Sequence, residues 1–163
     1  MTDTKRLYRA NRRQVLAGAT VLAGLGLPAL QTARAQLQAN PAALALAIRK
    51  VAGDAEVKTG RVKLDVPPLS ENGNSVALTV TVDSAMTPTD YVKSIHVFAE
   101  KNPQSNVISV QLGPRAGQPT IQTRMRLADT QDIIAIAELS DGTFWRDVRS
   151  VVVTLGACLE DPV

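Results

Sequence analysis

Hydrophobic and polar residues alternate with a period of two along much of the chain after residue 60. The alternation is clearest in residues 61–66, 76–82 and 121–127, where every second side chain is apolar except Thr123. This period is typical of a β-strand that buries one of its faces. The other strand candidates are residues 91–99, 106–112, 132–139 and 143–155. About seven strands at regular spacing, with no long helix between them, predict a β-sandwich.

Short turns separate these strand candidates. Asn72-Gly73 and Asp141-Gly142 are pairs that favour tight hairpins, and Pro67-Pro68 ends the first strand. Such connections fit antiparallel strands. The Cys-Trp-Cys pattern of antibody domains is absent, so only the architecture is predicted. The expected fold class is an all-β, immunoglobulin-like antiparallel sandwich with an extended C-terminal tail.

A short helix is predicted before the strands. Asn40 is a suitable cap, Pro41 suits the first helical position and Gly53 suits the end. One apolar stripe at helical spacing is formed by Leu44, Ile48 and Val51. This stripe packs either on the edge of the domain or against a partner. Residues 54–60 are polar and are expected to form a loop.

The first 35 residues have the layout of an export signal. A cationic head is followed by the uncharged stretch 15–30 and by the cleavage motif Ala33-Arg34-Ala35. Within the head, Arg12-Arg13 followed by Gln14-Val15-Leu16 matches the twin-arginine pattern. The alternative, a membrane anchor, needs about 20 strongly apolar residues. We therefore expect cleavage before Gln36, a periplasmic location and no membrane association afterwards.

The predicted organisation is a signal (1–35), a helix and sandwich (36–155) and a C-terminal arm (156–163). Six of the 18 basic and one of the 15 acidic residues lie in the signal, leaving 12 basic and 14 acidic residues in the mature chain. A mature chain that is slightly acidic does not have the clustered basic face that nucleic-acid binding requires. No nucleic-acid partner is predicted.

Few residues are available for catalysis or metal binding. The chain has one histidine, His96, and one cysteine, Cys158, and it lacks CxxC, HxH, HExxH and GxSxG motifs. No metal and no cofactor are predicted. His96 is either a packed or surface strand histidine or the base of a Cys–His pair. An autonomous enzyme is the weakest of the functional hypotheses.

Two further pairs of residues have open interpretations. Phe144 and Trp145 follow a tight turn, so they either anchor an interface or pack into and over the core. Arg124 and Arg126 share one strand face. They form either a solvated surface or a contact with an anion or a partner.

Cys158 is the residue around which the functional prediction is built. It lies five residues from the end, beyond the last apolar run and close to Glu160 and Asp161. A single cysteine forms no internal disulfide, and an odd cysteine in an exported chain indicates intermolecular pairing or a functional thiol. The negative neighbours disfavour the nucleophilic thiolate. From Leu155 the thiol reaches roughly 10 Å along an extended chain, so it suits a handle that another protein modifies.

Several segments resemble the SoxY family of covalent sulfur carriers in thiosulfate oxidation. The most specific are YVKSIHVFAEKNP at 91–103 and ELSDGTFW at 138–145, and the resemblance extends from the twin-arginine signal to the terminal cysteine. It implies a non-catalytic periplasmic carrier that forms a heterodimer with a SoxZ-like subunit. By motif matching, Cys158 is the covalent attachment site, and Gly156 and Ala157 belong to the flexible arm.

The resemblance also implies transient partners. A haem c enzyme attaches thiosulfate to the cysteine oxidatively, a metal-dependent hydrolase releases sulfate, and a sulfane dehydrogenase oxidises the remaining sulfur. The arm departs from the family's usual Gly-Gly-Cys-Gly-Gly ending, because it reads Gly156-Ala157-Cys158-Leu159-Glu160. The alternative function is therefore a divergent periplasmic module that binds non-covalently and has impaired or altered carrier activity.

Overall fold

The computed structural model describes residues 40–157; residues 1–39 and 158–163 lie outside the described part. The first element of the described part is helix α2 (Pro41–Ala52). Asn40 Oδ1 accepts a hydrogen bond from Ala43 N at 3.0 Å, and Gly53 ends the helix with a φ of 62°. The predicted cap, first helical residue and stop are confirmed. Among the described residues, no helix has the length and apolar character needed to cross a membrane.

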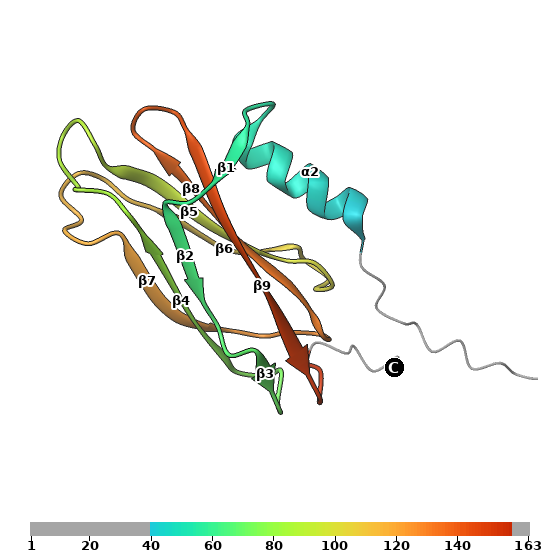
Figure 1. The fold of residues 1–163 in the computed structure, drawn as a ribbon. Coiled ribbons are helices and arrows are strands. Elements are labelled where there is room, and N and C mark those ends of the chain that lie inside the picture. The colour runs from blue at the N-terminus through green and yellow to red at the C-terminus, as the bar shows by residue number, and fades with distance from the viewer. Residues whose placement is uncertain (1–39, 158–163) are drawn as a thin grey trace, which may run out of the picture. The chain divides into compact units, whose positions relative to one another are not determined.

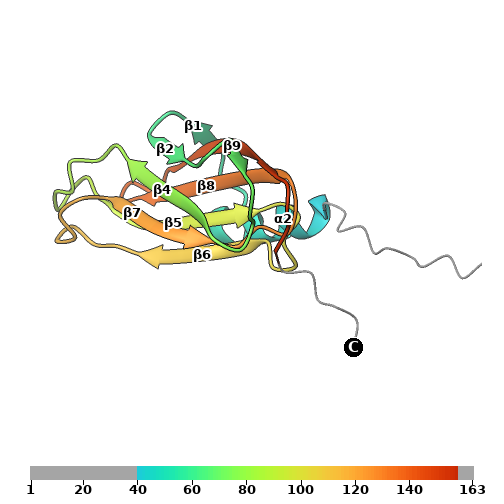
Figure 2. The ribbon, with the colours of Figure 1, turned by 90° about the horizontal axis from the view of Figure 1, so that it is seen from below.

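Two sheets form the body of the protein (Figures 1 and 2). The strands of the described chain are β1 (Val57–Thr59), β2 (Val62–Asp65), β3 (Leu69–Ser70), β4 (Val76–Val82), β5 (Val92–Ala99), β6 (Asn106–Gln111), β7 (Thr120–Met125), β8 (Gln131–Leu139) and β9 (Phe144–Val153). The larger sheet has the order β1-β9-β8-β5-β6, with β3 also paired to β9, and the smaller sheet has the order β2-β4-β7. The predicted β-sandwich with a short N-terminal helix is confirmed.

The main core fills the space between the two sheets. In β4 buried and more exposed positions alternate along the strand, and Leu78 and Val80 point into the core. From the larger sheet, Ile95, Ile133 and Val151 are completely buried in the same cluster. Burial of apolar area on this scale is the main source of folding free energy. The period-two pattern of the sequence therefore identifies the correct inward faces.

A second apolar cluster lies between helix α2 and the outer face of the larger sheet. Leu44, Ile48 and Val51 pack there, as the helical stripe predicts. Their partners on the sheet are Phe98, Ile134, Ile136 and Phe144. The helix thus covers part of the domain, which confirms the first of the two interpretations of its stripe.

The edge of β9 differs from the prediction. Residues 54–60, expected to be a loop, contain β1, and both β1 and β3 pair with β9 in parallel. Between them β2 leaves for the smaller sheet, but Leu64 N still donates to Asp147 Oδ2 at 2.9 Å and Arg149 Nε donates to Leu64 O at 3.3 Å. Strands of three and two residues are too short to show a period in the sequence.

The two predicted turns also have different outcomes. Asp141-Gly142 forms the antiparallel β8–β9 connection, with a φ of 80° at Gly142 and a bond from Thr143 N to Asp141 Oδ1. Asn72-Gly73 does not form a hairpin, because β3 and β4 belong to different sheets. Gly73 is buried and its φ is not positive, so its role is close packing instead of a tight turn.

Candidate functional site

The predicted attachment residue, Cys158, lies outside the described residues, and Ala157 is the last residue before it. The structure therefore describes the point where the arm leaves the sandwich. We call residues 155–157 the arm base. Gly156 and Ala157, assigned from the sequence to a flexible arm, are included in it. Their flexibility stays a prediction, but their contacts define how the arm is attached.

Backbone hydrogen bonds connect the arm base to two other segments. Gly73 N donates to Leu155 O at 2.7 Å, Leu127 N donates to Gly73 O at 2.8 Å, and Ala157 N donates to Leu127 O at 2.8 Å. These bonds link segments far apart in the sequence in a series. Ala157 is buried, with only 4% of its surface exposed. The chain is thus held to the domain up to the residue that precedes Cys158.

Two glycines allow this close approach. A Cβ atom on Gly156 would lie 2.1 Å from Ala128 O, and one on Gly73 would lie 2.3 Å from Leu127 O. Both obstacles are backbone carbonyls, which do not move aside as the end of a flexible side chain does. The family-like glycine at position 156 therefore permits close packing against the domain, in addition to any freedom that it gives the backbone.

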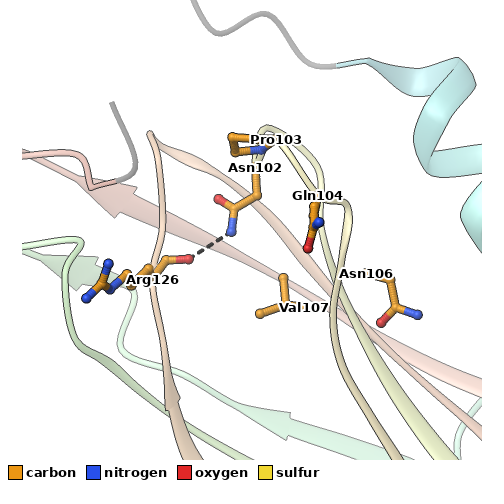
Figure 3. A pocket seen from close by; sticks show the side chains of 6 residues that line it. All are labelled: Asn102, Pro103, Gln104, Asn106, Val107 and Arg126. Carbon is orange, nitrogen blue, oxygen red and sulfur yellow. Dashed lines mark hydrogen bonds between the residues drawn. The ribbon is translucent and has the colours of Figure 1, made fainter. Parts of the chain in front are cut away.

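Side-chain amides hold the 126–128 segment in place. Asn102 Oδ1 accepts from Ala128 N at 3.0 Å, and Asn102 Nδ2 donates to Arg126 O at 2.8 Å (Figure 3). Gln131, 4% exposed, donates from Nε2 to Asn102 Oδ1 at 3.0 Å. A buried amide without a hydrogen-bond partner costs folding free energy, and the amides of Asn102 and Gln131 all have partners. Their bonds to residues on both sides of Leu127 hold the carbonyl that accepts the hydrogen bond from Ala157. The sequence does not predict this role of Asn102, because Asn102-Pro103 indicates only the end of a strand.

An open pocket adjoins these amides. It has a volume of about 260 Å³. Its lining residues are Asn102, Pro103, Gln104, Asn106, Val107 and Arg126. Figure 3 shows that the guanidinium group of Arg126 points away from Asn102 and Asn106, so neutral amides and an apolar floor dominate the pocket. The pocket contains no nucleophile or general base, and its chemistry is limited to hydrogen bonding.

His96 is buried in a hydroxyl network on the outer face of the larger sheet. Its Nδ1 lies 2.9 Å from Ser109 Oγ and its Nε2 lies 3.1 Å from Ser94 Oγ. Both ring nitrogens are therefore occupied by serine hydroxyls, which favours a packed strand histidine over the base of a Cys–His pair. Burial lowers the pKa of His96 below its usual range, while the charge of Glu138 acts weakly in the opposite direction.

This burial predicts a pH dependence of stability. Because the pKa of His96 is lower in the folded state than in the unfolded chain, the unfolded chain binds the proton first as the pH falls. The free energy of unfolding should be unaffected well above the unfolded value of about 6.5 and should decrease as the pH falls below it. Urea unfolding between neutral and mildly acidic pH measures this. His96→Gln should have a smaller decrease, and an unchanged pH profile would contradict the prediction.

The aromatic pair next to the Asp-Gly turn packs on both faces of β9. Phe144 belongs to the cluster beneath helix α2, and Trp145 packs against the main core. Trp145 Nε1 donates to Thr143 Oγ1 at 2.9 Å, and Lys58 Nζ lies 5.9 Å from the centroid of the indole. The core interpretation of these residues is confirmed. Phe144 is buried, and Trp145 is partly exposed.

Arg124 and Arg126 are both exposed next to the arm base, and Met125 between them is buried. Arg124 Nη1 contacts Ser75 O and Oγ at 3.4 and 3.3 Å. The carbonyl of Arg126 is used by Asn102, but its guanidinium has no hydrogen bond to any residue in 40–157. Both side chains thus present positive charge at the end of the sandwich from which the arm leaves.

Exposed apolar side chains also lie near the arm base. Leu69 and Val152 are neighbours across the β3–β9 pairing and are 54% and 48% exposed. Leu155, in the arm base itself, is 61% exposed. We call Leu69, Val152 and Leu155 the apolar edge. Residues 40–157 contain no cluster of three or more His, Cys, Asp or Glu residues that can hold a metal ion.

Comparisons with known proteins agree with the fold. The family model described as sulfur oxidation protein SoxY matches residues 48–158. The sulfur carrier protein SoxY from Chlorobium limicola f thiosulfatophilum is 28% identical, with a TM-score of 0.59 over 71% of this chain and 99% of that chain. No curated protein sequence matches the chain.

Other solved structures share the fold alone. A superoxide reductase (neelaredoxin) from Ignicoccus hospitalis is 14% identical, with a TM-score of 0.53 over 60% of this chain and 94% of that chain. At this identity only the architecture is comparable. The family match covers more than half of the chain and ends at Cys158, beyond the buried arm base. The chain belongs to the SoxY family of sulfur oxidation proteins.

Proposed function

We propose that this protein is a periplasmic sulfur carrier that binds thiosulfate-derived sulfur covalently through Cys158. The observation that carries the proposal is that the family match extends to residue 158, so the only cysteine falls inside the region similar to SoxY. The likeness to the Chlorobium sulfur carrier supports the same role. Export through the twin-arginine pathway, with the signal in residues 1–35, belongs to this proposal.

The proposed chemistry is a cycle on one sulfur atom. The thiol of Cys158 and thiosulfate give an S-thiosulfonate, Cys–S–S–SO₃⁻, with the loss of two electrons to the attaching haem c enzyme and one proton to water. Hydrolysis of the terminal S–S bond by the partner hydrolase consumes one water and releases sulfate, which leaves a persulfide on Cys158. A sulfane dehydrogenase then oxidises the outer sulfur to an S-sulfonate, taking up six electrons while three waters supply the oxygen. A second hydrolysis releases sulfate and regenerates the thiol of Cys158. The carrier itself supplies no catalyst for these steps.

The environment of the arm base supports a carrier better than an enzyme. The adjoining pocket is lined by amides and has no base or nucleophile, and both nitrogens of His96 are bonded to serines. Activation of the thiol therefore has to come from a partner's active site. What the domain contributes is a rigid attachment point for the cysteine.

We also propose that a SoxZ-like subunit binds this protein as a heterodimer. The apolar edge supports this, because neighbouring exposed apolar side chains mark sites of protein interaction and the centre of an interface is apolar. A subunit bound at the apolar edge would lie close to the arm base. Replacement of Leu69 with Asp should weaken copurification of the two chains without unfolding the sandwich.

The experiment that tests the carrier function is intact-mass spectrometry. The exported protein is incubated with thiosulfate and the attaching enzyme, and its neutral mass should increase by one S₂O₃ unit, because R–SH becomes R–S–S–SO₃H. Peptide mapping should place the whole increase on the peptide that contains Cys158, and a thiol reductant should remove it. An unchanged mass, or an increase on another peptide, would rule out the covalent carrier.

A second candidate is a periplasmic module that binds its partners non-covalently. The observation in its favour is the arm sequence, in which Ala157, Leu159 and Glu160 stand where the family usually has glycine. These side chains widen the arm and add negative charge near an anionic cargo. The two candidates differ in whether Cys158 is needed, which a substitution at that position decides.

A further inference from the structure

We propose that strand β6 is an interaction surface for a second copy of this chain. Two β6 strands pair antiparallel about a two-fold axis at Val110 and join the larger sheets of the two molecules. The proposal goes beyond the carrier function, because it requires neither the cysteine nor a partner subunit. It rests on the backbone, the side chains and the position of β6 within residues 40–157.

The backbone of β6 has one open side. Among the described strands, β6 is the last of the larger sheet and pairs only with β5 (Figure 2). Leu112 N donates to Lys93 O at 2.8 Å, and in an antiparallel pair the residues bonded to the neighbouring strand alternate. The N–H and C=O groups of Ser109 and Gln111 therefore point away from β5. No other segment of residues 40–157 bonds to them.

The side chains of β6 suit pairing between identical strands. Residues 106–111 (NVISVQ) include no charged residue, no proline and no glycine, and three of the six are Val or Ile. Like charges repel across a strand pair, and two copies of this strand bring none together. Ile108, Val110 and Leu112 are only partly buried at this edge of the sandwich. A second strand therefore covers apolar surface there.

The other sheet edges of the described chain carry features that oppose strand addition. β1 and β3 have only three and two residues, and β1 contains Lys58; short edge strands and edge lysines are common protective features. In β2, the N–H and C=O groups of Leu64 are already bonded to Asp147 and Arg149. β7 carries Arg124, so self-pairing there brings like charges together. These differences favour β6.

The open backbone groups determine the register of the pair. When Ser109 of one copy lies opposite Gln111 of the other, both open residues of each strand exchange hydrogen bonds, and Val110 faces its own copy. A register centred on Ser109 would instead place Val107 opposite Gln111. Val107 has no partner in the β5–β6 register, which shifts at this point. The register centred on Val110 avoids this irregularity.

The size of the contact indicates a weak dimer. A single strand pair is smaller than the interfaces of roughly 1,200–2,000 Å² that stable complexes use, so the two copies should exchange in solution. The apolar edge lies at β3 and β9, and β8 and β5 separate β9 from β6 in the larger sheet. The dimer therefore leaves the surface assigned to the SoxZ-like subunit open.

Sedimentation equilibrium of the exported protein alone, from about 1 µM to 1 mM, measures the association. A reductant excludes dimers joined through Cys158, and we expect a reversible monomer–dimer equilibrium. Gln111→Lys places positive charges at diagonal positions of the pair and should raise the dissociation constant at least about 10-fold. Gln122→Lys, the matched control, adds the same charge at an exposed position of β7 and should leave the constant unchanged.

Charge pairing and cross-linking test the register. A mixture of the Gln111→Lys and Gln111→Glu variants should form dimers again, because opposite charges then face each other. In a Cys158→Ser background, Val110→Cys should form an intermolecular disulfide on oxidation, since residues at such a position have Cα atoms about 4.5 Å apart. Gln111→Cys should cross-link much more slowly, because the two copies of that residue lie roughly 7–8 Å apart on the diagonal.

Amide hydrogen exchange gives a measurement that needs no substitution. Exchange at Ser109 and Gln111 of the native protein should slow as the protein concentration rises, because their N–H groups become bonded in the dimer. Circular dichroism of the variants checks that loss of the dimer is not unfolding. Gln111 is exposed, so its replacement should leave the sandwich intact.

Four results would overturn the proposal. The first is a monomer over the whole concentration range, and the second is a dimer that Gln111→Lys and Gln122→Lys affect equally. The third is cross-linking of Gln111→Cys as fast as that of Val110→Cys. The fourth is a monomeric chain whose binding to the SoxZ-like subunit is weakened by Gln111→Lys, which would show that β6 receives a strand of that subunit. None of these measurements involves sulfur transfer, so failure here is distinguishable from failure of the carrier function.

Discussion

Replacing Cys158 with Ser should remove the covalent sulfur adduct completely while leaving the sandwich folded. The chain has no other cysteine, so no second thiol can take its place. A serine hydroxyl does not form a stable S–S bond, and the attaching step therefore has no product on this chain. The described contacts end at Ala157, so the substitution removes none of the hydrogen bonds that hold the arm base.

The measurement is intact mass after incubation with thiosulfate and the attaching enzyme, followed by turnover in the reconstituted partner system. Leu159→Ser is a suitable control, because it changes the arm next to the thiol and keeps the cysteine. The control should still form the adduct. If Cys158→Ser supports normal turnover, the covalent carrier is excluded and the non-covalent module becomes the function.

Gly73→Ala should destabilise the protein by about 1–3 kcal/mol, as expected for overpacking of a tight site. The new Cβ would lie 2.3 Å from Leu127 O and 3.0 Å from Ala157 N. Both atoms belong to the hydrogen-bond series of the arm base, so relief of the clash has to lengthen or break a bond in that series. The free energy of unfolding in urea measures the loss, and hydrogen exchange at the amide of Ala157 measures the opening of the arm base.

Gly113→Ala is the matched control for this substitution. A Cβ there has no atom within 4 Å, and its φ is not in the left-handed region. The control should change stability by no more than a few tenths of a kcal/mol. Equal effects of the two substitutions would show that the approach of Gly73 to Leu127 is not important for the fold.

The period-two alternation of apolar and polar residues, together with the turn residues, predicts most of the sandwich. The alternation in residues 76–82 gives the inward face of β4 directly, and the cap at Asn40 gives the start of α2. These signals are local, because they depend on side chains a few residues apart. The parallel pairing of β1 and β3 with β9 joins residues far apart in the sequence, and no local pattern records it.

The site is less predictable than the fold. The importance of the terminal cysteine follows from its uniqueness and from the family resemblance, whereas the attachment of the arm does not. Gly73 reads as a hairpin glycine, but the structure uses it for contact with Leu127 and the arm base. Asn102 has no motif at all, since its role depends on the backbone of residues 126–128.

The bond from Ala157 to Leu127 has a consequence for the enzymes that handle the cargo. Cys158 directly follows the hydrogen-bonded Ala157, and the Cα atoms of consecutive residues are only about 3.8 Å apart. If the reaction centre of an enzyme lies at the bottom of a deep, narrow funnel, the hydrogen bond from Ala157 to Leu127 has to break before the sulfur can enter. An enzyme with a wide mouth can press directly against the Gly73 and Leu127 segments and react with the sulfur there.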